Sequence, residues 1–333
     1  MSPRRAAAGR SAQSKVGPAT ARLSDVDLAD RNSIAMWPGR HVEVGGSRLF
    51  VRTTPTTSGV AEPAVFLHGL GGASTNWTDL AGLLRDRLAV EAVDLPGFGR
   101  SDPSAADDYR VEAQARTVIA YLEQSGRAPV HLAGNSMGGA VSILVAAQRP
   151  DLIRTLTLIS PAIPDTNPLR AHALRGDPRM ALLMMPGIGG LAMRKVAGAG
   201  AEVRVRATIA LVFADKSRYP EQRMAEAIAE AKDRESLEWA NTAFLRSLRG
   251  LARSQLVGNR SWAALRSIAV PTLVVWGDRD RLVSPSLAPE VAAAIPDSRL
   301  LVLQNVGHTA MMEDPETTAR AMLAMLEDVR ARA

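Results

Sequence analysis

The chain of 333 residues is long enough for one large domain, or for a core domain with a smaller inserted one. Hydrophobic residues make up 46% and charged residues 22%, which is ordinary for a folded globular protein and excludes wholesale disorder, collagen and coiled coil. The absence of cysteine excludes disulfides, thiolate-bound zinc, iron–sulfur clusters and cysteine nucleophiles. The five histidines are widely scattered and no apolar run has the length of a membrane span, so we expect no metal site and no stable membrane insertion.

Most of the net charge of +6 lies at the N-terminus. Residues 1–23 hold five basic residues and no acidic one, which leaves +1 for the rest of the chain. We therefore predict that residues 1–36 form a basic, disordered tail and that the nearly neutral body binds no nucleic acid. Arg4-Arg5 resembles the start of a twin-arginine signal, but polar and basic residues follow it instead of an apolar stretch. We expect a cytoplasmic protein, with a transit peptide as the alternative.

From Trp37 onward, short apolar runs alternate with helical patterns, which is typical of a mainly parallel sheet with crossover helices. Gly45-Gly46 separates two short runs and predicts a hairpin at the edge of the sheet. Apolar residues recur with helical spacing from Val111 to Leu122. The predicted buried strands are Ala64–Leu67, Ala89–Asp94, Val130–Ala133, Ile153–Ile159, Thr272–Trp276 and Leu300–Leu303.

The strand pattern stops after Ser160 and resumes only at Pro271. The intervening stretch is rich in Met, Ala and Arg and is punctuated by proline and glycine, which indicates helices separated by turns. We assign residues 161–264 as a helical cap, inserted into an α/β core of residues 37–160 and 265–333. The Met-rich run Met180–Met193 predicts a soft apolar surface that adapts to varied ligands, with ordinary core packing as the alternative.

Residues Gly134 to Gly138 form a G-x-S-x-G sequence between a predicted strand and the apolar run Ala140–Ala147. In this strand–turn–helix context the two glycines leave room for a sharp turn that presents the serine between them. We therefore predict that Ser136 is a nucleophile. A glycine-rich turn without a catalytic role is the alternative.

A serine hydroxyl needs a base within hydrogen-bond reach and an acid that orients the base. Asp278 and Asp280 follow one predicted strand and His308 follows the next, at the sheet edge where ligands bind. We predict His308 as the general base, rather than as a loop histidine that caps the following helix, and Asp280 as the orienting acid. Asp165 competes for that role, as does Asp278, which we expect to form a turn through hydrogen bonds to its own backbone.

The tetrahedral oxyanion of acyl transfer needs two backbone donors, one from the residue after the nucleophile and one from an earlier loop. The loop from His68 to Gly72 follows a predicted strand, so we assign the N–H groups of Leu70 and Met137. We expect His68 to form structural hydrogen bonds at the strand end. The loop matches neither phosphate-binding glycine motif, so we predict no nucleotide cofactor.

With these motifs in this order, the chain from about Trp37 to the C-terminus resembles the α/β-hydrolase superfamily, in its branch with a helical cap. The resemblance rests on five segments, His68–Gly72, Asp94–Ser101, Gly134–Gly139, Trp276–Asp280 and Gly307-His308. It implies an α/β-hydrolase fold, a Ser136–Asp280–His308 triad, an oxyanion hole of Leu70 and Met137, and no cofactor. It also implies a pocket for a small-molecule substrate between core and cap.

Within this superfamily, haloalkane dehalogenases and epoxide hydrolases use aspartate at the elbow, so Ser136 favours hydrolysis through an acyl-enzyme. The apolar cap and near-neutral body indicate a carboxylic ester with a fairly hydrophobic, uncharged acyl group. The elbow is also similar to that of hydrolases that cleave carbon–carbon bonds in ring-fission products. Those enzymes typically carry tryptophan where this chain has Thr309, although Arg179 or Arg194 could bind a dianionic dienoate. A perhydrolase, a thioesterase or a non-catalytic ligand-binding protein would also fit this fold, and the oligomeric state is left open.

Overall fold

The computed structural model describes residues 18–28, 34–56, 59, 61–165, 198–256 and 259–332. Within these residues the strands form one sheet in the order β1-β9-β8-β7-β6-β4-β5-β3-β2. The pairs β2–β3 and β3–β5 are antiparallel, and all other neighbours are parallel. The strands are β1 (Ala19–Thr20), β2 (Gly39–Val44), β3 (Ser47–Thr53), β4 (Glu62–Leu67), β5 (Leu88–Val93), β6 (Val130–Asn135), β7 (Ile153–Ile159), β8 (Thr272–Gly277) and β9 (Ser298–Leu303).

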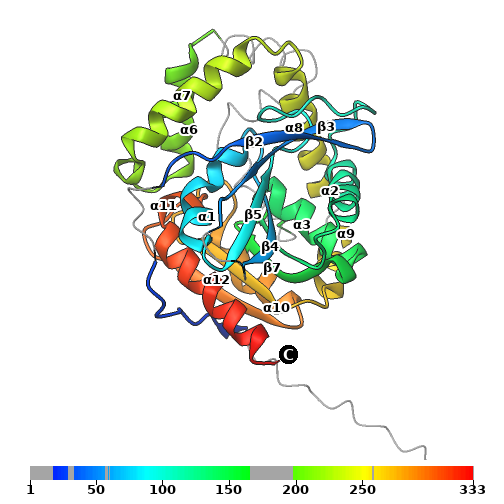
Figure 1. The fold of residues 1–333 in the computed structure, drawn as a ribbon, viewed down its shortest axis with the longest axis vertical. Helices are drawn as coiled ribbons and strands as arrows, with labels where there is room; N and C mark the ends of the chain where they lie inside the picture. The colour runs from blue at the N-terminus through cyan, green and yellow to red at the C-terminus, as the bar shows by residue number, and fades with distance from the viewer. Residues whose placement is uncertain are drawn as a thin grey trace, which may run out of the picture.

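Helices cover both faces of this sheet (Figure 1). One apolar core lies under α2, α3, α9 and α10, and a second lies under α1, α11 and α12. Because both faces are covered, the central strands are mostly buried and largely apolar, as is typical of a parallel sheet. The helices of these two layers are α1 (Thr78–Leu84), α2 (Val111–Ser125), α3 (Met137–Gln148), α9 (Asn259–Ser267), α10 (Ala288–Ala294), α11 (Ala310–Glu313) and α12 (Pro315–Arg330).

The predicted fold class is confirmed. Each predicted buried strand is present to within two residues at either end, because a buried apolar run is a strong local signal. The predicted hairpin is also present, and Gly45 and Gly46 take φ values of 54° and 82°, the left-handed conformation that its turn requires. Helix α2 ends at Gly126, whose φ is 64°.

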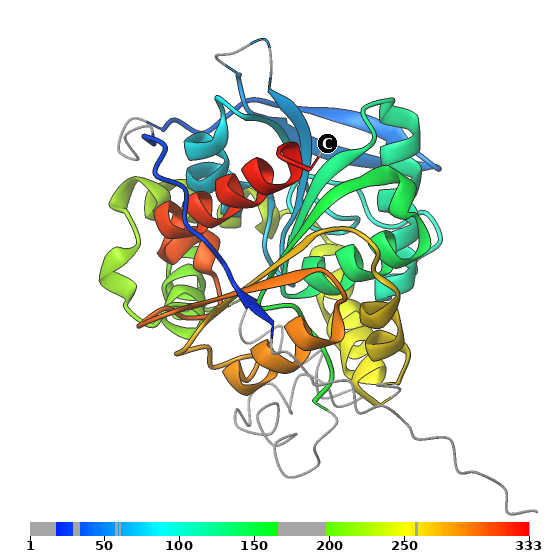
Figure 2. The same cartoon turned by 90° about the horizontal axis from the view of Figure 1, so that it is seen from below.

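The expectation of a disordered tail over residues 1–36 is wrong for the part that the structure describes. β1 pairs in parallel with β9, and Figure 2 shows the following residues running along α12. Ser24 is buried there, its Oγ donates to Glu327 at 2.6 Å, and Arg22 pairs with Glu327 and Asp328. A two-residue strand leaves no periodic pattern, so the sequence around it could not reveal the pairing. Residues 1–17 and 29–33 lie outside the described residues.

Helices from the assigned cap lie together over one end of the core (Figure 1). They are α6 (Ala201–Val212), α7 (Glu221–Glu235) and α8 (Ala240–Leu256). Helix α9 lies across the assigned boundary at residue 264 and packs against α3 and α10, so it belongs to the core layer. The Met-rich run Met180–Met193 lies outside the described residues, as do Arg179 and Arg194. No helix in the described ranges is both long and apolar enough to cross a lipid bilayer.

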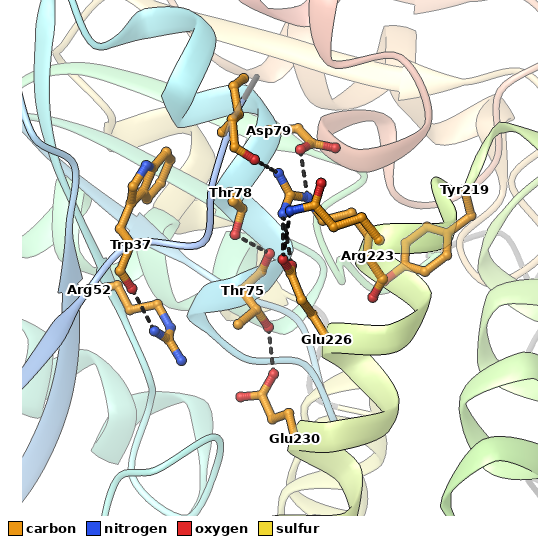
Figure 3. Close-up of polar contacts among 11 residues, drawn as sticks. Trp37, Arg52, Thr75, Thr78, Asp79, Tyr219, Arg223, Glu226 and Glu230 are labelled. Atoms are coloured by element: carbon orange, nitrogen blue, oxygen red, sulfur yellow. Dashed lines mark hydrogen bonds and ion pairs between the residues drawn. The ribbon is translucent and has the colours of Figure 1, made fainter. Parts of the chain in front are cut away.

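Helix α7 is attached to the core through a buried arginine (Figure 3). The guanidinium of Arg223 donates to Asp79 on α1 at 2.8 Å, to both oxygens of Glu226, and to the carbonyl of Ile34 at 2.5 Å. Arg223 is 7% exposed, so these ion pairs are almost fully removed from water. Charges buried in this way are stable only when they are paired and hydrogen bonded.

Further polar contacts continue along the same face of α7. Thr75 donates to Glu230 at 2.6 Å, and Arg234 donates to the carbonyl oxygens of Gly99 at 2.9 Å and Gly97 at 3.3 Å. Burial raises the pKa of Glu230 and lowers the pKa of Arg234. The inner face of this cap helix is therefore charged rather than apolar.

We expect Arg223→Ala to reduce the free energy of unfolding by about 3 kcal/mol, because it removes the cation from two carboxylates at a buried site. Arg206→Ala on α6 is the matched control, since its pair with Glu202 is exposed and should contribute no more than about 0.5 kcal/mol. Urea unfolding of both variants measures the difference. Equal losses in the two variants would contradict the prediction.

Candidate active site

Ser136 lies in a strained turn between β6 and α3. Its φ of 52° and ψ of −115° are conformations that a residue with a side chain rarely adopts. The turn is fixed because the Ser136 N–H donates to the carbonyl of Ile159 at 3.1 Å, and the Ser136 carbonyl accepts from Ala162 at 2.9 Å. The serine is half-buried, so its hydroxyl group is reachable at the carboxyl edge of the sheet.

The flanking glycines are needed because the turn presses against neighbouring backbone. A Cβ on Gly138 would collide with the carbonyl oxygens of Leu67 and His68, and a Cβ on Gly134 would collide with the carbonyl of Gly138. A larger residue at Gly138 would push α3 away from the end of β4, and one at Gly134 would push α3 away from β6. The sequence motif and the observed turn therefore have the same steric cause.

The loop after β4 lies directly against the serine. A Cβ on Gly69 would lie 3.1 Å from the Cβ of Ser136. Leu70 follows Gly69 and Met137 follows Ser136, and neither of their backbone N–H groups donates a hydrogen bond to any residue that the structure describes. Within the described ranges, two backbone donors without a partner thus follow Gly69 and Ser136 in the chain.

His308 and Asp280 are brought together by the loops after β9 and β8. His308 Nδ1 lies 2.8 Å from Asp280 Oδ2, and both side chains are buried. Because an ionised carboxylate only accepts hydrogen bonds, Nδ1 carries the proton and Nε2 is left as an acceptor. The other oxygen of Asp280 accepts from the N–H groups of Leu282 at 2.8 Å and Val283 at 3.0 Å.

Two opposing effects act on the pKa of Asp280. Burial raises it, but the adjacent His308 and the hydrogen bonds from His308, Val283 and Leu282 together hold the pKa below its ordinary value of 3.8. The carboxylate is therefore ionised at neutral pH, in the form that orients an imidazole.

Asn135 links the serine turn to the histidine loop. Its Nδ2 donates to the carbonyl oxygens of Ile159 and His308, both at 3.0 Å. The residue before Ser136 is thus tied to the backbone of His308, across 173 positions of sequence. No hydrogen bond joins the side chains of Ser136 and His308, both of which lie in the described part of the chain.

The competing aspartates do not contact the histidine. Neither Asp278 nor Asp165, both within the described ranges, forms a hydrogen bond with His308. The expectation that the side chain of Asp278 bonds to its own backbone is wrong, because it is the carboxylate of Asp280 that accepts from the next backbone N–H groups. Asp278 instead holds β8 to β9 through its N–H, which donates to Leu303.

His68 has the structural role predicted for it. Its Nδ1 donates to the carbonyl of Gly69 at 2.7 Å and its Nε2 accepts from the N–H of Leu95 at 3.0 Å. Asp94 supports the same region, because its carboxylate accepts from the backbone of Ser74 at 2.5 Å and of Arg100 at 2.8 Å. These buried side chains hold two loops beside Ser136 in place.

Two residues that contact loops of the site were not predicted from the sequence. Glu313 is buried at the end of α11, and its carboxylate accepts a hydrogen bond from the His308 loop. Phe244 on α8 packs against the loop after β4, since a Cβ on Gly71 would lie 3.0 Å from its ring. In the sequence, Glu313 is followed directly by Asp314 and then by Pro315 and Glu316, so no local signal distinguishes it, and none marks Phe244. In the ranges that the structure covers, no group of three or more His, Asp or Glu side chains could hold a metal ion.

The chain matches a known protein family and is similar in sequence to several known proteins. A sequence model of the family described as alpha/beta hydrolase fold matches residues 63–315. The dihydrolipoyllysine-residue acetyltransferase component of an acetoin cleaving system from Pseudomonas putida is 32% identical over 79% of this chain. The match spans 63% of that relative, which is less than two thirds of its length.

Two further similarities cover most of both chains. Lipase 1 from Psychrobacter immobilis is 28% identical over 81% of this chain and 79% of the lipase. The crystal structure of a membrane phospholipase A, described as a bacterial virulence factor, matches with a TM-score of 0.70 and 27% identity over 90% of this chain and 89% of that one.

We expect the fold to lose stability in mild acid because of its buried histidines. Burial lowers the pKa of His68 and of His131 below the ordinary value of 6.5. Below pH 6.5 the unfolded chain then binds protons that the folded chain does not. The free energy of unfolding should therefore be highest above pH 6.5 and decrease as the pH drops through this value.

Urea unfolding between about pH 8 and about pH 5 measures this dependence. The free energy of unfolding of His68→Asn should depend less on pH than that of the wild type. His131 should account for much of the pH dependence that remains in this variant. A free energy of unfolding that stays constant in the wild type over this range would contradict the prediction.

Proposed function

This chain belongs to the α/β-hydrolase family, and we propose that it is a serine hydrolase that cleaves carboxylic esters through an acyl-enzyme. One observation carries the proposal: the buried pair of His308 Nδ1 and Asp280 Oδ2 is tied through Asn135 to the strained turn that presents Ser136. A nucleophile, a base and an orienting acid are the three parts that acyl transfer by serine requires.

In the proposed reaction, His308 Nε2 takes the proton of Ser136 Oγ as Oγ attacks the carbonyl carbon of the ester. Asp280 stabilises the imidazolium that forms, and the N–H groups of Leu70 and Met137 bind the oxyanion. Collapse of this intermediate breaks the bond to the alcohol, which leaves with the proton from His308. Water then attacks the acyl-enzyme in the same way, and the acid is released from Ser136. The hydrogen bond between Ser136 and His308 is expected to form when substrate binds, because such contacts are often loose in an empty enzyme.

The surroundings of Ser136 support a hydrophobic, uncharged acyl group. Leu70, Ala162 and Phe244 are half-buried apolar residues that pack against the core, Ala162 at the serine turn and Phe244 against Gly71 in the loop after β4. The names of two similar proteins, a lipase and a membrane phospholipase A, agree with an ester of a fatty acid. Apolar walls stabilise an acyl chain by removing its surface from water.

We expect Ser136→Ala to lower kcat on p-nitrophenyl esters by at least about a thousandfold, because no other group can form the acyl-enzyme. Ser267→Ala is the control, since Ser267 lies at the exposed end of α9 and its Oγ bonds only within that helix. Turnover of acetate through palmitate esters is measured for both variants and the wild type, with thioesters and a ring-fission dienoate in parallel. Ester turnover that survives Ser136→Ala would overturn the proposal, and turnover of the dienoate alone would make the protein a carbon–carbon hydrolase.

We expect Phe244→Ala to shift the preference toward longer acyl chains, because it removes a ring that fills space beside Gly71. The ratio of kcat/KM for long over short esters should rise at least about tenfold, the usual effect of one or two methylenes in an apolar pocket. Leu251→Ala is the matched control, since Leu251 is half-buried on the same helix but about two turns away. An unchanged ratio in Phe244→Ala would contradict this role.

A further inference from the structure

The carboxylate of Glu313 lies buried where the histidine loop meets the cap. The residue is 3% exposed and accepts three backbone hydrogen bonds. Oε2 accepts from Gly307 at 2.7 Å and from Ala214 at 3.1 Å, and Oε1 accepts from Asp215 at 2.8 Å. Gly307 is the residue before His308, whereas Ala214 and Asp215 follow the end of cap helix α6. One carboxylate therefore joins two segments that lie far apart in the sequence.

A second contact joins the same two segments without Glu313. The N–H of His308 donates to the carbonyl of Val212 at 2.7 Å. The backbones are so close that a Cβ on Gly307 would lie 2.7 Å from the nitrogen of Ala214 and would collide with the carbonyl of Val212. The position of the histidine loop is thus set by segment 212–215 of the cap as well as by the sheet.

We propose that Glu313 is a positioning residue for His308, which it acts on through Gly307 by holding the histidine loop against segment 212–215. The proposal rests on the function proposed above. All three partners of the carboxylate are backbone N–H donors, which is the arrangement that a carboxylate, an acceptor through both oxygens, can satisfy. Asp280 orients the imidazole from its Nδ1 side, whereas Glu313 fixes the backbone from which the imidazole extends. Neither contact alone determines where Nε2 lies relative to Ser136.

Two substitutions separate the bonds that Glu313 makes. Glu313→Ala removes all three. Glu313→Gln can keep the bonds from Gly307 and Ala214 on its amide oxygen, but its NH₂ group then faces the N–H of Asp215. Glu316→Gln is the control, because Glu316 is an exposed glutamate three residues further along the chain.

We expect Glu313→Ala to lower kcat by about a hundredfold per titrated active site, with KM changed less than about threefold, because a misplaced base slows the chemical step rather than binding. Glu313→Gln should lower kcat about tenfold, and Glu316→Gln should lower kcat less than about twofold. Active sites are titrated with a phosphonate ester so that unfolded protein is not counted.

The low-field proton resonance of His308 Nδ1, assigned by its loss in His308→Gln, gives a readout that does not depend on turnover. It should shift or disappear in Glu313→Ala, shift less in Glu313→Gln and stay in place in Glu316→Gln. If Glu313→Ala or Glu313→Gln only lowers the melting temperature, while kcat per active site and the resonance stay as in the wild type, Glu313 is merely structural and the proposal is wrong. Turnover that survives Ser136→Ala would instead overturn the proposed function, and the resonance would still test whether Glu313 positions His308.

Discussion

The site depends on how closely the turn after β6 approaches the end of β4. The first turn of α3 rests on the carbonyl oxygens of Leu67 and His68, and only a residue without a Cβ fits at Gly138. This approach forces Ser136 into its unusual backbone conformation and brings the loop of Gly69 and Leu70 alongside it. It also places the N-terminus of a twelve-residue helix directly after the serine, where its partial positive charge would favour the oxyanion of the proposed reaction.

From this turn outward, the site is assembled largely by buried hydrogen bonds to the backbone of its loops. Asn135 holds the histidine loop from below, and segment 212–215 of the cap holds it from the other side. Buried backbone groups that are fully paired resist displacement, because breaking a pair leaves an unsatisfied donor or acceptor. The short, polar junctions between loops therefore give the site a rigidity that its solvent-facing position would not provide by itself.

Sequence patterns predict the strands, the hairpin and the serine turn because each has a local cause. Apolar runs form the buried strands, and Gly45-Gly46 permits the turn of the hairpin. Gly134 and Gly138 permit the sharp turn at Ser136. The order of Ser136, Asp280 and His308 along the chain could also be anticipated, since each follows a strand whose carboxyl end lies at the same edge. The oxyanion role of Leu70 and Met137 stays a prediction.

Features that depend on distant partners could not be predicted. β1 has only two residues and takes its stability from β9 and α12, so nothing near Ala19 indicates a strand. Asp278 and Asp280 are two residues apart in one loop, and only the three-dimensional path of that loop decides which of them meets His308. Glu313 is similar, because two of its three partners, Ala214 and Asp215, come from a cap segment about a hundred residues earlier.

The charged inner face of α7 has a consequence for the folded protein in water. If this helix were to separate from the core, the surfaces uncovered would carry Arg223, Glu230 and Arg234 together with their polar partners. Water solvates such groups well, whereas the opening of an apolar interface would expose a hydrophobic surface that promotes aggregation. Opening would thus uncover groups that water can solvate, and because these pairs are buried while the helix is in place, added salt would weaken them little.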